Sequence, residues 1–151
     1  MTAFTRNTVL QALFNVVSAS SGFQATGRKL VAWTEQTSQP ALFQRIIGEE
    51  FAPLEGYGQP QKKTLHVELW IYAQTDIADT PESVILPLLD ALDTALATNT
   101  LYDGRQQLGL EGFVDHAWRQ GETVISQGET GTQAIIVVPV RVSVIAPFTT
   151  S

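Results

Sequence analysis

The sequence predicts one α+β domain, residues 1–151, in which two helices pack on a mainly antiparallel sheet with a long β-hairpin arm. A length of 151 residues is typical of a single domain. Two segments place their apolar residues at helical spacing, whereas the segments between and after them alternate or are rich in β-branched residues. The order of one helix, three strands, one helix and two or three strands is typical of α+β domains.

The first helix is predicted at residues 6–19. Its apolar stripe consists of Leu10, Leu13, Phe14 and Val17. Thr5 stands just before the stripe and is suited to be the N-cap, because its hydroxyl can accept a hydrogen bond from the first turn.

The second helix is predicted to begin at Pro81, with Thr80 as its N-cap. Its apolar stripe consists of Val84, Leu88, Leu92 and Leu96. Pro87 conflicts with this helix because proline has no backbone N–H. Either the helix kinks at Pro87, or regular helix begins close to it.

Residues 64–74 form the clearest predicted strand. One side carries Leu65, Val67, Leu69, Ile71 and Ala73, and the other carries His66, Glu68, Trp70, Tyr72 and Gln74. We expect this strand to pair with residues 41–51 in a long hairpin, 41–75, whose tip at 53–63 is rich in turn-forming residues. Pro40 marks the start of the hairpin, since the residue before a proline avoids helical geometry.

An unbroken strand over residues 41–51 predicts that Phe43 and Ile47 lie on one side and that Leu42 and Ile46 lie on the other. Glu49 and Glu50 then point to opposite faces, so they cannot act together on one substrate atom.

Three further strands are expected, at residues 28–34, in the segment 112–126 and at residues 133–147. The last is rich in valine and contains Pro139, which cannot donate to a ladder hydrogen bond. We therefore expect an edge strand or a bulge at Pro139. The repeated motif QGET flanks a short strand at residues 123–126.

No constellation for catalysis, for a metal or for a cofactor emerges from the sequence. There are no cysteines, and no serine lies in a nucleophile motif. His66 near Glu68 and His116 beside Asp115 are conceivable metal or base sites, but neither histidine has metal-ligand spacing. We expect a protein without enzymatic activity.

The overall charge and hydropathy exclude some classes of partner. The formal net charge of −6 and the scattered basic residues argue against tight nucleic-acid binding. No apolar run is long enough for a membrane span, and the N-terminus does not have the pattern of a signal peptide.

Trp70 and Tyr72 share a strand face opposite an aliphatic one. Because both faces of the strand carry apolar residues, something must cover the aromatic side. Two alternatives stay open, namely a helix of the same chain and a neighbouring subunit.

Over residues 5–147 the chain resembles the tail terminator, or tail completion, proteins of long-tailed bacteriophages and prophages. Four segments carry the resemblance: QPALFQRIIGEEF, TLHVELWIYAQT, LPLLDALDTALA and the stretch QGETGTQAIIVVPVRV near the C-terminus. The segment LGLEG departs from the family pattern, so no contact is carried over for residues 103–112.

The resemblance implies a virion protein at the head–tail junction, assembled in the cytoplasm of the host bacterium. It implies a homo-oligomeric ring, typically a hexamer, that caps the head-proximal end of the tail tube and ends tube polymerisation. Further implied partners are the tail tube protein, the head–tail connector or stopper protein, and genomic DNA that passes through the lumen without specific binding. No cofactor and no membrane is implied.

The candidate contacts with neighbouring subunits or with the tube are Tyr57, Lys62, Lys63, Trp70, Tyr72, Pro139 and Arg141. The first alternative function is another tail or neck component, such as a tube subunit or a head completion protein. The second alternative is a small enzyme that uses His116 with Asp115 or Glu68.

Overall fold

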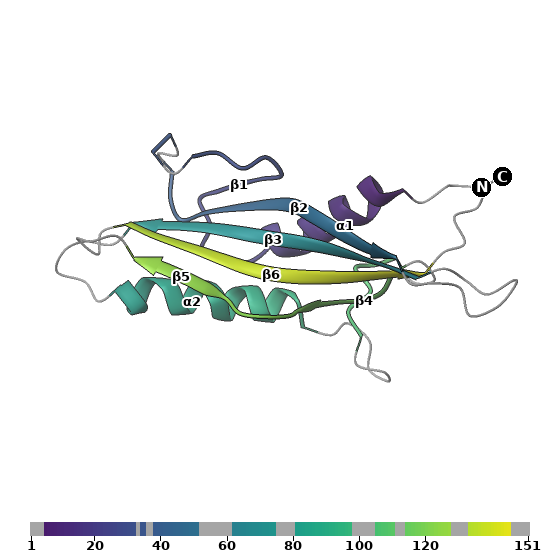
Figure 1. Ribbon diagram of the computed structural model, residues 1–151. Helices are drawn as coiled ribbons and strands as arrows, with labels where there is room; N and C mark the ends of the chain where they lie inside the picture. The colour runs from purple at the N-terminus through teal and green to yellow at the C-terminus, as the bar shows by residue number, and fades with distance from the viewer. Residues whose placement is uncertain are drawn as a thin grey trace, which may run out of the picture.

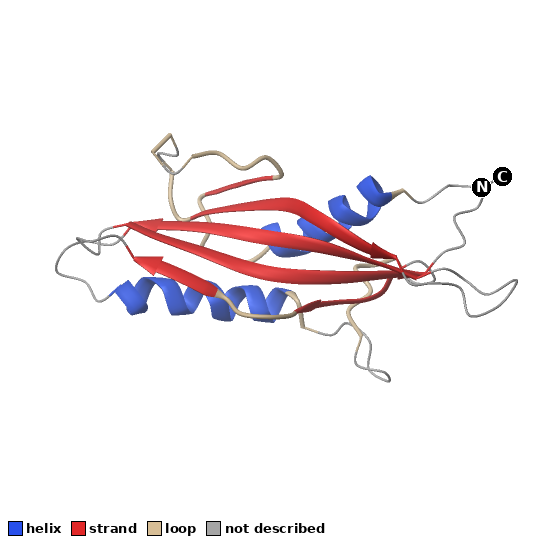
Figure 2. Cartoon of the chain, in the orientation of Figure 1, coloured by secondary structure: helices blue, strands red, loops and turns tan. Residues whose placement is uncertain are grey.

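A computed structural model describes residues 5–32, 34–35, 38–51, 62–74, 81–97, 105–110, 114–127 and 133–145. These residues form two helices and one six-stranded sheet (Figures 1 and 2). The elements are α1 (Arg6–Ser18), β1 (Ala25–Gly27), β2 (Ala41–Phe51), β3 (Lys62–Gln74), α2 (Pro81–Ala95), β4 (Val114–Arg119), β5 (Val124–Gln127) and β6 (Gln133–Ile145). The predicted α+β class is confirmed.

The sheet has the strand order β1-β2-β3-β6-β4, and β5 also pairs with β6. Only β1 and β2 run parallel, so the sheet is mainly antiparallel as predicted. Strands β2 and β3 form the long hairpin, whereas residues 52–61 of its tip lie outside the described residues. Strands β3 and β6 pair along their whole length and form the centre of the sheet.

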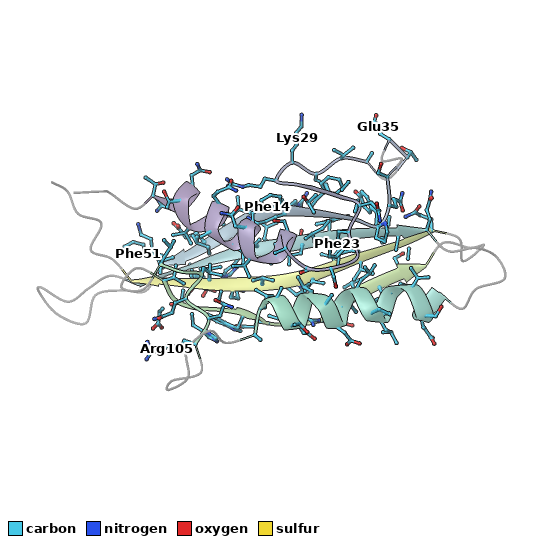
Figure 3. The ribbon with its side chains drawn as sticks, turned by 180° about the vertical axis from the view of Figure 1, so that it is seen from behind. Phe14, Phe23, Lys29, Glu35, Phe51 and Arg105 are labelled. Atoms are coloured by element: carbon cyan, nitrogen blue, oxygen red, sulfur yellow. The ribbon has the colours of Figure 1, made fainter. Side chains whose placement is uncertain are left out.

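Both helices cover the same face of this sheet, as the view from behind shows (Figure 3). Their buried residues include Leu13 and Val17 of α1 and Ile85 and Leu92 of α2. They pack against the aliphatic side of β3 and against the alternate residues of β6, from Ala134 to Val144. The two-sided pattern of residues 64–74 is thus realised, with its aliphatic side in the core.

Helix α1 begins where the sequence predicts. The hydroxyl of Thr5 accepts a hydrogen bond from the backbone N–H of Thr8 at 3.1 Å, which is the geometry of an N-cap. Helix α2 has Pro81 as its first residue and continues through Pro87. Ile85, Leu88 and Leu92 are buried on both sides of this proline, and their burial offsets its cost of about 3 kcal/mol.

The predicted strand at residues 28–34 is wrong. The strand in this region is β1 at Ala25–Gly27, which pairs with Ala41–Phe43 of β2. Leu30 and Val31 instead pack over the sheet against Phe43 and Tyr72. Their apolar character reflects burial above the sheet, and not pairing within it.

The prediction that Pro139 lies on an edge strand or at a bulge is also wrong. Strand β6 is an interior strand and pairs with β3 through Pro139 in continuous register. On its other side, β6 pairs with β5 over residues 134–137 and with β4 over residues 140–144. Pro139 therefore lies at the gap between two partner strands, where no ladder donor is needed.

A β-bulge in β2 changes the predicted sides of its second half. Ile46 pairs with Val67 and Gly48 pairs with His66, so Ile47 is the extra residue. Beyond the bulge the alternation shifts by one residue. Phe51 consequently lies on the helix-covered face, whereas Phe43 lies on the opposite one, and the expected unbroken alternation is wrong.

Candidate assembly surface

The sheet has one face without helices, which is turned toward the viewer in Figure 1. Direct pairing across the strands places a mixed set of aromatic, aliphatic and charged residues on this face. We call it the open sheet face and define it by Arg45, His66, Glu68, Trp70, His116, Trp118, Val137, Pro139 and Arg141.

One end of this side of the sheet is covered by the chain itself. Tyr72 is only 3% exposed, and its hydroxyl donates a hydrogen bond to the carbonyl oxygen of Val31 at 2.6 Å. Phe43 packs against the Tyr72 ring with 5.6 Å between the ring centroids. Burial raises the pKa of Tyr72 above its ordinary value. The cover at this end is therefore the segment after β1, and not a helix.

Trp70 forms the centre of a polar and aromatic cluster at the rim of that cover. Its indole N–H donates to Glu68 at 3.1 Å, and the Arg45 guanidinium lies 5.5 Å from its ring centroid. Arg45 also pairs with Glu68 at 3.3 Å between Nε and Oε1. Three side chains from two neighbouring strands thus hold one another in place, and Trp70 stays half-buried.

The other half of the open sheet face comes from β6 and β4. Val137 lies opposite Trp70, and Arg141 lies between His66 and Trp118. Trp118 stacks on His116 with 5.2 Å between the ring centroids. Its indole N–H donates to Gln120 at 2.8 Å. Apart from the exposed Gln120, these side chains are half-buried and leave part of their rings and aliphatic groups exposed.

The candidate contact residues named from the sequence do not all share this face. Trp70, Pro139 and Arg141 lie on it, whereas Tyr72 is covered by Val31. Lys63 points to the helix-covered side, where its ammonium lies 5.4 Å from the Phe51 ring centroid. Tyr57 and the side chain of Lys62 lie outside the described residues.

The histidines are engaged in structural contacts. The Nδ1 atom of His116 accepts a hydrogen bond from the backbone N–H of Gln106 at 3.0 Å. His66 lies 3.9 Å from the exposed carboxylate of Glu50. Within the described ranges, no group of three or more His, Asp or Glu side chains is arranged to hold a metal ion.

Glu49 and Glu50 separate as predicted. Glu49 pairs with Arg6 of α1 on the helix-covered side, with 2.5 Å between Arg6 Nε and Glu49 Oε1, and Glu50 lies beside His66 on the other side. The hydrogen bond from Arg6 lowers the pKa of Glu49, and burial opposes this shift. The two carboxylates do not form a site.

Two further surface features were not found from the sequence. A groove runs beside α1 and is lined by Asn7, Thr8, Gln11, Ala12, Asn15, Val16, Leu108 and Leu110. Exposed aliphatic residues also gather on the outer strands β2 and β5. The paired isoleucines at positions 46 and 47 were the available signal for the second feature. In the described part of the chain, no helix is long and apolar enough to cross a membrane.

No protein-family model matches the sequence, and no curated protein matches it either. Among solved structures, the chain is similar in fold to a chain from the virion of a native gene transfer agent particle. The TM-score is 0.52 and the sequence identity is 11%, and the likeness covers 91% of this chain and 92% of that one. The shared fold thus extends over nearly the whole of both chains.

Proposed function

We propose that the protein is a structural component of a phage-type virion and acts as its tail terminator. In this role, copies form a ring, typically a hexamer, on the head-proximal end of the tail tube. The ring ends tube polymerisation and joins the tail to the connector or stopper of the head. The function needs no catalytic residue and no cofactor.

The observation that carries the proposal is the likeness of fold to a virion chain over nine-tenths of both chains. The likeness therefore extends over the whole domain and is not limited to one motif. The sequence resemblance over residues 5–147 points independently to the terminator among virion proteins.

The open sheet face supports an assembly role. It presents Trp70, Trp118 and Val137 on rigid strands, and aromatic residues are enriched at protein interfaces. Arg45, Arg141 and Glu68 lie among them, so the surface combines apolar area with charges of both signs. Rigid elements of this kind suit contacts that must repeat identically around a ring.

The charge of the chain supports the passage of DNA. Each copy carries a formal net charge of −6, and a ring multiplies this charge around one axis. A negatively charged assembly repels the phosphate backbone, so DNA can pass through without being held.

The direct test combines the purified protein with growing tail tubes made from the tube protein of the same virion. Electron microscopy should show rings of the protein alone and a ring on one end of each tube. Tubes should also stop growing once the protein is added. A strict monomer that neither binds tube ends nor changes tube length would contradict the proposal.

The same experiment separates the terminator from other tail and neck components. A tube subunit would add along the tube and lengthen it, whereas a head completion protein would bind the connector and leave tube ends free. A His116→Ala variant with unchanged assembly and no lost hydrolytic activity would rule out the enzyme alternative.

A further inference from the structure

The large apolar residues that remain exposed are concentrated on two outer strands. Across the described residues they are Ile46 (46%), Ile47 (47%), Phe51 (52%), Leu86 (48%), Val124 (52%) and Ile125 (42%). Three of them lie on β2 and two on β5, and only Leu86 lies on a helix. Single exposed apolar residues need no explanation, but their grouping on two strands does.

In the part of the chain that the structure describes, the backbone of residues 44–51 in β2 and of β5 is also unpaired on its outer side. Strand β1 pairs with β2 only as far as Phe43, and no described residue pairs with residues 44–51 on the side away from β3. Among the described residues, strand β5 pairs with β6 alone. By contrast, the outer side of β4 is occupied, because the N–H of Ala117 donates to the carbonyl of Gln106 at 2.9 Å. The two free edges therefore lie diagonally across the sheet (Figure 1).

We propose that the β2 edge, residues 44–51, of one copy pairs with the β5 edge, residues 124–127, of the next copy. This contact rests on the proposed ring and names the surface through which it closes. Strands that expose both apolar side chains and free backbone groups associate with another strand. The partner of each free edge is a second copy of the chain. Because one chain carries both edges, a head-to-tail contact between copies covers both edges at once.

The strand directions fit such a contact. Each step from β2 to β3, from β3 to β6 and from β6 to β5 reverses the direction, so β5 runs antiparallel to β2. Copies related by rotation about one axis keep this relation. The pairing between copies is therefore antiparallel, which is the more stable ladder.

The stagger between the two edges fits a closed ring. Gly48 lies level with Arg141 of β6, and Ile125 lies level with Ile136, five residues away on the same strand. At about 3.4 Å per residue, the two edges are offset from each other along the strand direction by roughly 17 Å. Four strands about 4.8 Å apart make a subunit roughly 19 Å wide, so this stagger tilts the strands by about 40° from the ring axis. Closed sheets have strand tilts of this size, about 35–45°.

A two-fold contact of β2 with β2 is the main alternative arrangement. It leaves Val124 and Ile125 exposed and closes at two copies. Disulfide cross-linking separates the two arrangements, because the natural chain contains no cysteine to interfere.

The experiment uses full-length Ile47→Cys and Ile125→Cys variants under ring-forming conditions with a mild oxidant. We expect each variant alone to stay uncross-linked and an equimolar mixture of the two to shift to covalent dimers. The double variant should give a ladder that ends at the ring size. Val124→Cys and Ser126→Cys serve as neighbouring positions, so that a register shifted by one residue is still detected. A mixture of Leu86→Cys with Ile125→Cys is the matched control and should remain monomeric under denaturing, non-reducing conditions.

Two results would overturn the edge contact. One is cross-linking of Ile47→Cys with itself, which shows the two-fold contact. The other is the absence of cross-linking from every mixture while electron microscopy still shows rings, which leaves the proposed function standing. Efficient cross-linking of a ring that does not stop tube growth would instead retain the edge contact and refute the terminator role.

Discussion

The carbonyl oxygen of Pro139 accepts a hydrogen bond from the backbone N–H of Gln120, with 3.2 Å between the two atoms. The N–H and C=O of one residue point to the same side of an antiparallel strand. The missing N–H of Pro139 thus faces residues 120–123, where β4 has ended and β5 has not begun. An interior strand can contain proline here because its partner is interrupted at the same place.

This placement predicts the effect of proline substitutions along β6. Pro139→Val should change the free energy of unfolding by only about 1 kcal/mol or less, because no ladder bond is gained or lost. Val138→Pro is the matched control. Its N–H points toward β3, so this variant should lose about 3 kcal/mol or more. Urea unfolding followed by circular dichroism measures both values. Equal effects of the two changes would contradict the explanation.

Removing the Tyr72 hydroxyl should lower stability locally. Tyr72→Phe removes the hydrogen bond to Val31 but keeps the ring against Phe43. We expect a loss of about 1 kcal/mol in urea unfolding at neutral pH. Residues 28–32 should then exchange their amide hydrogens faster, whereas α2 should not change. Unchanged exchange in residues 28–32 would show that the hydroxyl does not fix this segment.

Tyr72 should also make the free energy of unfolding depend on pH in the alkaline range. Burial raises the pKa of Tyr72 above 10.0, so the folded state holds this proton more tightly than the unfolded state. The stabilising contribution of the protonated Tyr72 hydroxyl is complete below the pKa that Tyr72 has in the unfolded state. It is lost as the pH rises through the pKa that Tyr72 has in the folded state. The wild-type chain should therefore lose more stability than Tyr72→Phe between about pH 9 and about pH 11. Parallel losses in both proteins would contradict this.

The helices and the central hairpin could be predicted because their patterns are local and strong. The alternation from Leu65 to Ala73 matches the helix-covered face of β3, and Thr5 caps α1 as expected. These signals need no knowledge of distant partners, because burial on one side and capping geometry decide them.

The errors arise where a distant partner decides the structure. Nothing near Leu30 and Val31 shows that they cover Tyr72, which is about forty residues further along the chain. The bulge at Ile47 depends on the register with Val67 and His66, which a single strand does not specify. Pro139 is tolerated only because of where β4 and β5 end.

The candidate surface was predicted only in part, for the same reason. The shared side of Trp70 and Glu68 follows from alternation, and the open sheet face contains both. The free edges of β2 and β5 follow from the strand order, which the sequence does not specify. A single exposed isoleucine does not indicate whether its strand lies at a free edge of the sheet.

The pair of Arg6 and Glu49 predicts an acid-dependent contribution to stability. Arg6 donates to both carboxylate oxygens of Glu49 and joins the start of α1 to β2. The Arg6 side chain is 52% exposed, so solvent screening limits the pair to about 0.2–1 kcal/mol. The hydrogen bond lowers the pKa of Glu49 below 4.5, so the contribution is present above that value and is lost as pH falls through the folded pKa.

The variant Glu49→Gln tests this contribution. At neutral pH it should be less stable than the wild type, and the difference should shrink as pH falls below about 4. An NMR titration should place the pKa of the Glu49 carboxyl below its ordinary value. A Glu49 carboxyl that titrates at its ordinary value would show that the pair does not persist in solution.

Leu69 and Trp70 are neighbours on β3 that face opposite sides of the sheet, and they separate folding from assembly. Leu69 is fully buried under the helices, so Leu69→Ala should destabilise the chain by about 2–5 kcal/mol. Trp70 is half-buried on the open sheet face, so Trp70→Ala should cost less, about 1–3 kcal/mol. If the open sheet face mediates assembly, Trp70→Ala should abolish rings at a temperature where the monomer remains folded. Thermal unfolding and electron microscopy of the same preparations measure the two effects. A folded Trp70→Ala variant that still forms normal rings would show that the open sheet face is not an assembly surface.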